Sequence, residues 1–231
     1  MIIGRGMLAL AFSQYANNED VIIFASGVSN SRETNEKAFE REFNLIKATL
    51  SENPDKLFIY FSTCSMYDPH AKETLYVKHK LEIETYIEKN AEKFLILRVS
   101  QILGKSKNST LVNYLVDCIE NNKTFELWEN SNRNLIALDD VVRISKEFIE
   151  NSSYYNGTYH IANAHNIDVI DLVKLMETLL SKKASYTVTS RGEKYNPIPN
   201  DINTITSKIN ILMDERYYYN SLKDFIEKNK G

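Results

Sequence analysis

Short apolar runs alternate with longer amphipathic stretches along the first 100 residues. Each run ends in polar or turn residues and is rich in Ile, Val, Phe or Leu, which is typical of a buried strand. Between the runs, apolar residues recur at helical spacing. This alternation predicts βαβ units, whose parallel sheet binds ligands at its carboxyl edge. We expect strands at 21–25, 57–62 and 94–99, and helices at 7–17, 35–51 and 75–90.

The pattern changes after about residue 104, where short strands and helices are mixed. The sequence therefore predicts an α/β fold. A Rossmann-like doubly wound parallel sheet spans 1–105 and is completed by 134–164, and a smaller α/β substrate-binding lobe spans 106–231. Within the second half we expect helices at 110–121, 139–151 and 168–181, and strands at 124–128, 134–138 and 186–189.

Composition narrows the class of protein. The 231 residues carry a net charge of −3, which does not favour nucleic acid or an anionic membrane as a partner. The longest apolar runs are too short to span a bilayer, and no signal peptide is expected. Two cysteines and four histidines show no disulfide framework and no metal-ligand spacing. We expect a cytoplasmic, reduced, metal-free protein; its oligomeric state is open, and a homodimer is one option.

A glycine-rich turn opens the chain. Gly4-Arg5-Gly6-Met7-Leu8-Ala9 has the GxGxxA pattern, in which glycines let the backbone approach a pyrophosphate at a helix N-terminus. A tight turn without a ligand accounts for this short pattern about equally well. A dinucleotide fold usually carries an acid about 20 residues later, after a second strand, but here the first helix leads directly to the strand at 21–25. We therefore expect a βα(β) segment to be missing and the adenosine pocket to be reduced. Arg5 could meet a 2′-phosphate, which slightly favours NADP over NAD.

Tyr76 and Lys80 form a YxxxK pair on one face of a predicted helix. A nearby ammonium favours the phenolate of a tyrosine, which makes the phenol a usable acid or base near neutral pH. A chain with 14 tyrosines is expected to contain about one such pair by chance, and Tyr219 with Lys223 is a second. Position distinguishes the first pair, because the strand before its helix ends in Thr63, a hydroxyl residue at the ligand edge.

With these residues the chain resembles the extended short-chain dehydrogenase/reductase family, of the NAD-dependent epimerase/dehydratase type that acts on nucleotide sugars. The resemblance rests on motifs that follow the family's order along nearly the whole chain. They are Ser62-Thr63-Cys64-Ser65-Met66-Tyr67 for S-S/T-x-x-V-Y, Tyr76 and Lys80 for YxxxK, Leu97-Arg98-Val99-Ser100-Gln101-Ile102-Leu103-Gly104 for L-R-x-x-N-V-Y-G, Arg133-Asn134-Leu135-Ile136-Ala137-Leu138-Asp139-Asp140-Val141 for R-D-F-I-H-V-D-D-V, and Tyr159-His160-Ile161-Ala162 with Asp168-Val169-Ile170-Asp171-Leu172 for Y-N-I-G and S-I-x-E-L.

The resemblance implies a role for each matching residue. Tyr76 would exchange a proton with a sugar hydroxyl or ketone, Lys80 would favour the phenolate and hold the nicotinamide ribose, and Thr63 would hydrogen-bond the reacting oxygen. Arg133 would grip the substrate diphosphate with its guanidinium fork, or else it is a surface arginine in a turn. Cofactor binding is implied for Gly4, Arg5, Gly6, Ala25, Tyr76 and Lys80, and substrate binding for Thr63 and Arg133.

Departures from the family pattern narrow the chemistry. Cys64-Ser65 stands where family dehydratases carry Asp-Glu, so 4,6-dehydration is not expected. A lone cysteine at a strand end is more often a small buried filler than an acid or base. His70 and His79 are expected to be solvated, and Asp139 and Asp140 to cap the helix that follows.

These observations leave three functions open. The first is an NAD(P)-dependent nucleotide-sugar oxidoreductase, a 4-ketoreductase or epimerase in deoxysugar or surface polysaccharide biosynthesis. The second is a degenerate, non-catalytic family member that binds a nucleotide sugar or a protein, which the missing segment supports. The third is a Rossmann-like enzyme without nicotinamide. The sequence does not identify the sugar, the base or the stereochemical outcome.

Overall fold

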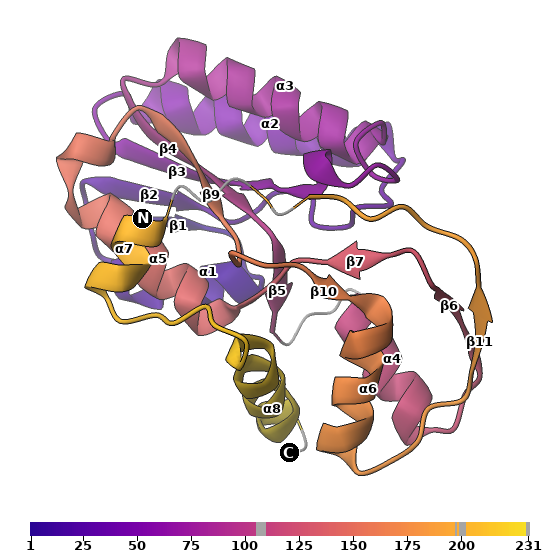
Figure 1. The fold of residues 1–231 in the computed structure, drawn as a ribbon. Helices are drawn as coiled ribbons and strands as arrows, with labels where there is room; N and C mark the ends of the chain where they lie inside the picture. The colour runs from indigo at the N-terminus through magenta and orange to yellow at the C-terminus, as the bar shows by residue number, and fades with distance from the viewer. Residues whose placement is uncertain (105–109, 197, 199–201, 230–231) are drawn as a thin grey trace.

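A parallel five-stranded sheet forms the centre of the computed structural model, which describes residues 1–104, 110–196, 198 and 202–229. Its strands lie in the order β1-β2-β3-β4-β9 (Figure 1). All residues of β2 and β3 are buried, because both faces of the sheet are covered; this explains their continuous apolar runs. The strands are β1 (Ile2–Ile3), β2 (Val21–Phe24), β3 (Leu57–Thr63), β4 (Lys93–Val99) and β9 (Gly157–Ile161).

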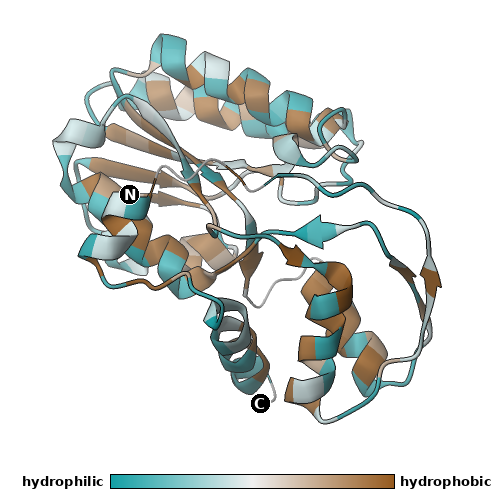
Figure 2. Cartoon of the chain, viewed as in Figure 1, coloured by the Kyte–Doolittle hydropathy of each residue, from teal (hydrophilic) through white to brown (hydrophobic). Residues whose placement is uncertain are grey.

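Helices cover the two faces of the sheet (Figure 1). α2 (Glu36–Glu52) and α3 (Leu75–Asn90) lie on one face, and α1 (Met7–Ala11) and α5 (Leu138–Glu150) lie on the other. Alternate residues of each strand enter the two cores, so Phe58 packs with α2 and α3 while its neighbour Ile59 packs on the α5 side. Figure 2 shows β2, β3 and β4 as continuously apolar, with polar residues on the outward sides of the helices.

The position of β1 explains the missing acid. The usual strand order is 3-2-1-4-5-6, but here β1 lies at the edge of the described sheet, next to β2. The connections β1–α1–β2 and β2–α2–β3 move across the sheet in the same direction, yet α1 and α2 lie on opposite faces. The two crossovers therefore have opposite hands, although right-handed crossovers predominate strongly. This is the geometry that remains when strands 2 and 3 of the usual order are removed, which confirms the predicted shortening.

The rest of the described chain forms a smaller lobe beside the carboxyl edge of the sheet (Figure 1). One hydrophobic cluster runs from α5 through α4 and α6 to α8, so the lobe and the sheet share a core. Its helices are α4 (Leu111–Glu120), α6 (Val169–Leu180) and α8 (Tyr217–Asn229), whereas α7 (Asn203–Lys208) packs on α5 (Figure 1). Its paired strands are β5 (Gln101–Leu103) with β8 (Leu135–Ala137), β6 (Phe125–Trp128) with β11 (Tyr186–Thr189), and β7 (Asn132–Arg133) with β10 (Ile167–Asp168).

Most expected elements are present, with differences at short elements. The helix expected at 7–17 ends at Ala11 and continues as a 3₁₀ turn, η1 (Ser13–Tyr15). The division expected between residues 105 and 106 lies outside the described residues and stays a prediction. Within the described ranges, no helix combines the length and apolar character needed to cross a membrane. Elements that the sequence did not suggest are β5, β7, β9, β10, α7, α8 and the 3₁₀ turns η2 (Ser65–Tyr67) and η3 (Ser152–Tyr154).

Candidate active site

Thr63 ends β3 at the carboxyl edge of the sheet, where the sequence placed it. Its side chain is buried and its hydroxyl is engaged locally: Oγ1 accepts the Ser65 amide at 3.0 Å and donates to Ser65 Oγ at 2.9 Å. This turn leads through η2 to α3, so a single short stretch connects Thr63 to the helix that carries Tyr76. The hydroxyl is therefore held in a fixed position at the edge where substrates bind in parallel sheets.

Tyr76 and Lys80 lie on one face of α3, as the four-residue spacing predicted. The helix begins after Thr74, whose hydroxyl accepts the Val77 amide at 3.3 Å and caps the first turn. Tyr76 is 8% exposed and Lys80 is 3% exposed. The Lys80 ammonium lies 5.9 Å from the centre of the Tyr76 ring and 4.8 Å from that of Tyr60. The phenol and the ammonium are thus neighbours at the end of β3.

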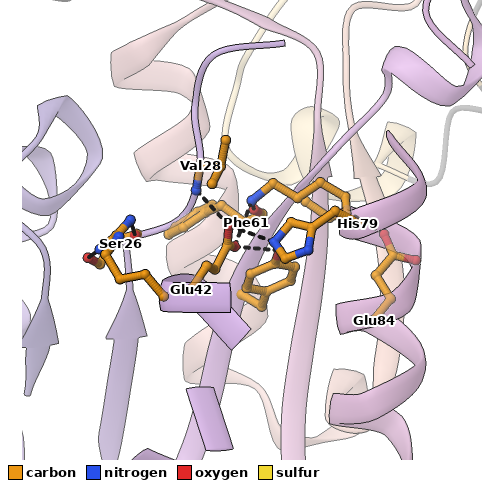
Figure 3. A network of polar contacts seen from close by, with 10 residues as sticks. Ser26, Val28, Glu42, Phe61, His79 and Glu84 are labelled. Atoms are coloured by element: carbon orange, nitrogen blue, oxygen red, sulfur yellow. Dashed lines mark hydrogen bonds and ion pairs between the residues drawn. The ribbon is translucent and has the colours of Figure 1, made fainter. Parts of the chain in front are cut away.

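A buried carboxylate that the sequence analysis did not identify holds Lys80 (Figure 3). Glu42, on α2, is fully buried, and its Oε1 accepts from Lys80 Nζ at 3.0 Å and from the Tyr60 hydroxyl at 2.8 Å. Its Oε2 accepts the Val28 amide at 2.6 Å and lies 3.1 Å from His79 Nε2. Burial opposes the charged form of Glu42, but Lys80 and the other donors outweigh burial and lower the pKa of Glu42 to about 2.

His79 therefore does not have the solvated position expected for it. The residue is 7% exposed, its ring centre lies 4.6 Å from that of Phe39 at a tilt of 39°, and its Nε2 contacts Glu42. The expectation failed because His79 precedes Lys80 on α3 and faces α2, not solvent. His70 is exposed and Cys64 is buried, as predicted.

The glycine-rich turn is built on the close approach of β1 and β2. Gly4 has φ +135°, and a Cβ there would lie 2.4 Å from the Ala25 carbonyl oxygen, so no other residue fits. Gly6 precedes α1, and a Cβ on it would meet nothing within 4 Å. Arg5 is exposed between them. The turn brings Gly4 and Ala25 together, and it leaves open space beside Gly6.

Arg133 reaches the same edge of the sheet from β7. Its Nη1 donates to the Asn132 carbonyl at 2.6 Å and lies 3.9 Å from Asp68 Oδ2. Asp68 follows η2, the turn after Thr63, so the structure brings Arg133 beside the segment that leaves the predicted catalytic strand. The Arg133 side chain is 27% exposed, which leaves part of its guanidinium fork accessible.

Three other residues of the family motifs, Arg98, Asp139 and Asp140, pair with side chains of the protein itself. Arg98, on β4, donates to both carboxylate oxygens of Glu84 on α3 at 2.6–3.2 Å. These hydrogen bonds raise the pKa of Arg98. Asp139 and Asp140 do not cap α5 as expected, because the N-cap position is Ala137 and both acids lie in the first turn. They pair instead with Lys228 at 2.8 Å and with the Tyr217 hydroxyl at 2.7 Å.

The grooves described in the structure lie away from these residues. One of about 490 Å³ is bounded by the start of α5 and by α8, and includes Asp140, Tyr217 and Asp224. The other, about 570 Å³, lies between α1 and α5. Neither groove is lined by Tyr76, Lys80 or Arg133. Within the described chain, no group of three His, Cys, Asp or Glu side chains is arranged to hold a metal ion.

The residues present fit the pyrophosphate of a dinucleotide beside Gly6, but they do not fit its nicotinamide ribose beside Lys80. Gly6 offers open space where the backbone of such folds approaches a pyrophosphate. At the other end, the Lys80 ammonium is buried and directed to Glu42 and to the Phe61 carbonyl, so it does not fit a ribose in this arrangement.

Comparisons with known proteins agree with this architecture. Curated protein sequences gave no match. Among solved structures, the chain is similar to a dTDP-4-dehydrorhamnose reductase from Clostridium acetobutylicum (17% identity, TM-score 0.70, 97% of this chain and 86% of that one). It is also similar to a UDP-N-acetylglucosamine 4-epimerase from Methanobrevibacter ruminantium (15%, 0.69, 93% and 77%) and to a dTDP-glucose 4,6-dehydratase from Bacillus anthracis (12%, 0.70, 97% and 78%).

The sequence itself matches a family model over more than half of its length. Residues 8–162 match the model described as NAD dependent epimerase/dehydratase family. The matched region includes the turn after Thr63, the Tyr76–Lys80 helix and Arg133. The chain therefore belongs to the NAD dependent epimerase/dehydratase family.

Proposed function

We propose that this chain is a nucleotide-sugar oxidoreductase, a 4-ketoreductase or epimerase that uses NAD or NADP. The observation that carries the proposal is the arrangement of Tyr76 beside Lys80, 5.9 Å from ring centre to ammonium, next to the strand end that bears Thr63. In this role Tyr76 transfers a proton to or from the sugar oxygen, and Thr63 hydrogen-bonds that oxygen. A bound nicotinamide dinucleotide supplies the hydride acceptor or donor.

The substrate class is supported by the substrate-side residues. Arg133 presents a partly open guanidinium at the same edge, which suits the diphosphate of a nucleotide sugar. The similar solved structures are a reductase, an epimerase and a dehydratase of dTDP or UDP sugars, and one of them is a complex with NAD. Dehydration is the least suited of these reactions, since Cys64-Ser65 replaces the expected acid pair.

A non-catalytic nucleotide-sugar or protein-binding module is the second candidate. The Glu42–Lys80 contact favours it, because the Lys80 ammonium is buried against a carboxylate and in this arrangement is not accessible to a ribose. The sheet also lacks, in its described part, the strands that flank the adenosine in the usual order.

Calorimetry and turnover separate the two candidates. NAD, NADH, NADP and NADPH are titrated into the protein, each with and without a UDP or dTDP sugar. The oxidoreductase proposal expects heat of binding for at least one dinucleotide and reduction or epimerisation of a 4-keto or 4-hydroxy sugar. Four flat dinucleotide titrations beside a clear nucleotide-sugar isotherm would support the non-catalytic module instead.

A further inference from the structure

Glu42 links three separate parts of the cofactor side of the site (Figure 3). From α2 its carboxylate reaches the Lys80 ammonium on α3 at 3.0 Å and the Val28 amide at 2.6 Å. Val28 belongs to the segment 25–28, which follows β2 at the carboxyl edge of the sheet; we call it the closing segment. The carboxylate is fully buried, so each of these contacts is made without competition from water.

The closing segment lies directly on the ion pair. A Cβ at Gly27 would lie 2.7 Å from Glu42 Oε1 and 2.8 Å from Lys80 Nζ, so a side chain there would have to displace the ends of these two side chains. The same helix holds the segment at a second point, where Arg41 donates to the Ser26 carbonyl at 3.0 Å. Two adjacent residues of α2 thus fasten the segment over Lys80.

We propose that Glu42 is an internal competitor for Lys80, which keeps the ribose side of the site closed until Glu42 and the closing segment move away. The proposal rests on the proposed function in one respect, namely that a dinucleotide is the ligand that binds when Lys80 is released from Glu42. Glu42 is a positioning residue in this account, because it acts on the ligand only through Lys80 and the segment.

The competition has a measurable consequence. When the binding-competent form is a minor fraction of the protein, the apparent dissociation constant rises by the inverse of that fraction. If the cluster served stability alone, weakening it would lower the free energy of unfolding but would not increase the affinity for any ligand. A tenfold or greater gain in affinity on weakening Glu42 is therefore the signature of competition.

The first experiment measures access to Lys80 without any cofactor. Pyridoxal 5′-phosphate forms an imine with accessible amines, borohydride fixes it, and peptide mass spectrometry locates the labelled lysine. Glu42→Gln removes the charge, whereas Gly27→Ala keeps both charges and forces the pair apart by contact. Glu40→Gln, an exposed position on the same helix, is the matched control, and the exposed Lys78 is the internal standard.

We expect Lys80 to label at least about tenfold faster in Glu42→Gln and Gly27→Ala than in the wild type and in Glu40→Gln. Equal labelling in all four proteins, or none in any, would overturn the proposal. Near-ultraviolet circular dichroism reports whether each variant is folded. If Glu42→Gln does not fold, Gly27→Ala decides the outcome.

The second experiment asks what the opening is for. Calorimetry with the four dinucleotides should give an apparent dissociation constant about tenfold lower in the variants whose Lys80 labels faster. Equal affinity in wild type and variants would refute the competition. Faster labelling with no dinucleotide binding in any protein would uphold the closed contact and would instead reject the proposed function.

Discussion

Among the cations that the family resemblance assigns to ligands, Lys80 and Arg133 have different surroundings. Lys80 is 3% exposed and meets Glu42 at 3.0 Å, whereas Arg133 is 27% exposed and its nearest carboxylate, Asp68, is 3.9 Å away. A fully desolvated carboxylate at hydrogen-bond distance attracts its cation more strongly than a partly exposed one at 3.9 Å. The cofactor side of the site is therefore closed by a strong internal contact, and the substrate side by a weak one.

The difference follows the architecture. On the cofactor side the sheet ends at β1, and the closing segment packs on α2 and α3 close to that edge. On the substrate side, β7 and β10 bring Arg133 to the end of β3 from a separate lobe, with an accessible side chain. Loss of strands thus affects the proposed cofactor half of the site and not the proposed substrate half, so both the enzyme and the binding module agree with the structure.

The largest expected effect is a loss of turnover on substitution of Tyr76, which would show that the closed half of the site is catalytically active. Tyr76→Phe keeps the ring and removes the acidic oxygen. If the chain is an enzyme, this variant should lose about 10²–10⁴-fold in kcat, the typical contribution of a general acid or base. Steady-state turnover of the identified nucleotide sugar measures it, with Tyr219→Phe, 42% exposed, as control. Near-normal turnover by Tyr76→Phe would contradict its assignment.

Lys80→Met should lower the stability of the protein much more than substitution of an exposed lysine on the same helix. Removing the ammonium leaves Glu42 as a buried carboxylate without its cation, which typically costs about 3–5 kcal/mol of unfolding free energy. Urea unfolding measures the loss, and Lys78→Met, at a 60% exposed side chain on the same helix, should change it by less than about 0.5 kcal/mol. A double variant with Glu42→Gln should recover part of the loss. A Lys80→Met protein as stable as the wild type would show that the pair is not coupled.

Acid should weaken the same contact. The folded pKa of Glu42, about 2, lies below its ordinary value of 4.5. A depressed carboxyl pKa stabilises the fold above the unfolded pKa, and this contribution is lost as the pH falls from about 4.5 toward 2. The shift corresponds to about 3 kcal/mol for this buried group. Urea midpoints measured between about pH 6 and pH 2.5 should converge for wild type and Glu42→Gln as the pH falls. A constant gap would contradict the low pKa.

The fold could be predicted where local pattern decides structure. β2, β3 and β4 are continuous apolar runs because both faces of the sheet are covered, and α3 spans Leu75–Asn90 as its apolar spacing indicated. β9 could not be recognised in this way: it contains Tyr159 and His160, and it joins the sheet only by pairing with β4, some 60 residues earlier. Pairing at that separation depends on tertiary packing that a local window does not contain.

The sequence predicted the residues of the site, but it did not predict that Lys80 is buried against Glu42. Motif order placed Thr63, Tyr76 and Lys80 at one edge, because strand ends and helix faces follow from spacing alone. The Glu42–Lys80 contact joins residues 38 positions apart and depends on the path of the closing segment, which no motif encodes. The one local signal was a carboxylate between Phe39 and Ile46 on the apolar face of α2, where an exposed acid is not expected.

The smallest predicted effect tests the open half of the site. Arg133→Ala should raise KM for the nucleotide sugar about tenfold or more with little change in kcat, because a charge-assisted hydrogen bond is worth about 1.5–3 kcal/mol and is lost equally from substrate and transition state. Asp68→Asn should act in the opposite direction and lower KM by up to about fivefold, since it removes a partner worth at most about 1 kcal/mol at 3.9 Å. Arg191→Ala, at a 68% exposed side chain paired with Glu126, is the control and should change neither constant.

If the protein has no turnover, the same three variants compared by calorimetry with the nucleotide sugar give the ratio of dissociation constants directly. Opposite shifts for Arg133→Ala and Asp68→Asn would assign the guanidinium to the substrate phosphate, whereas an unchanged KM or affinity in Arg133→Ala would place it on the surface.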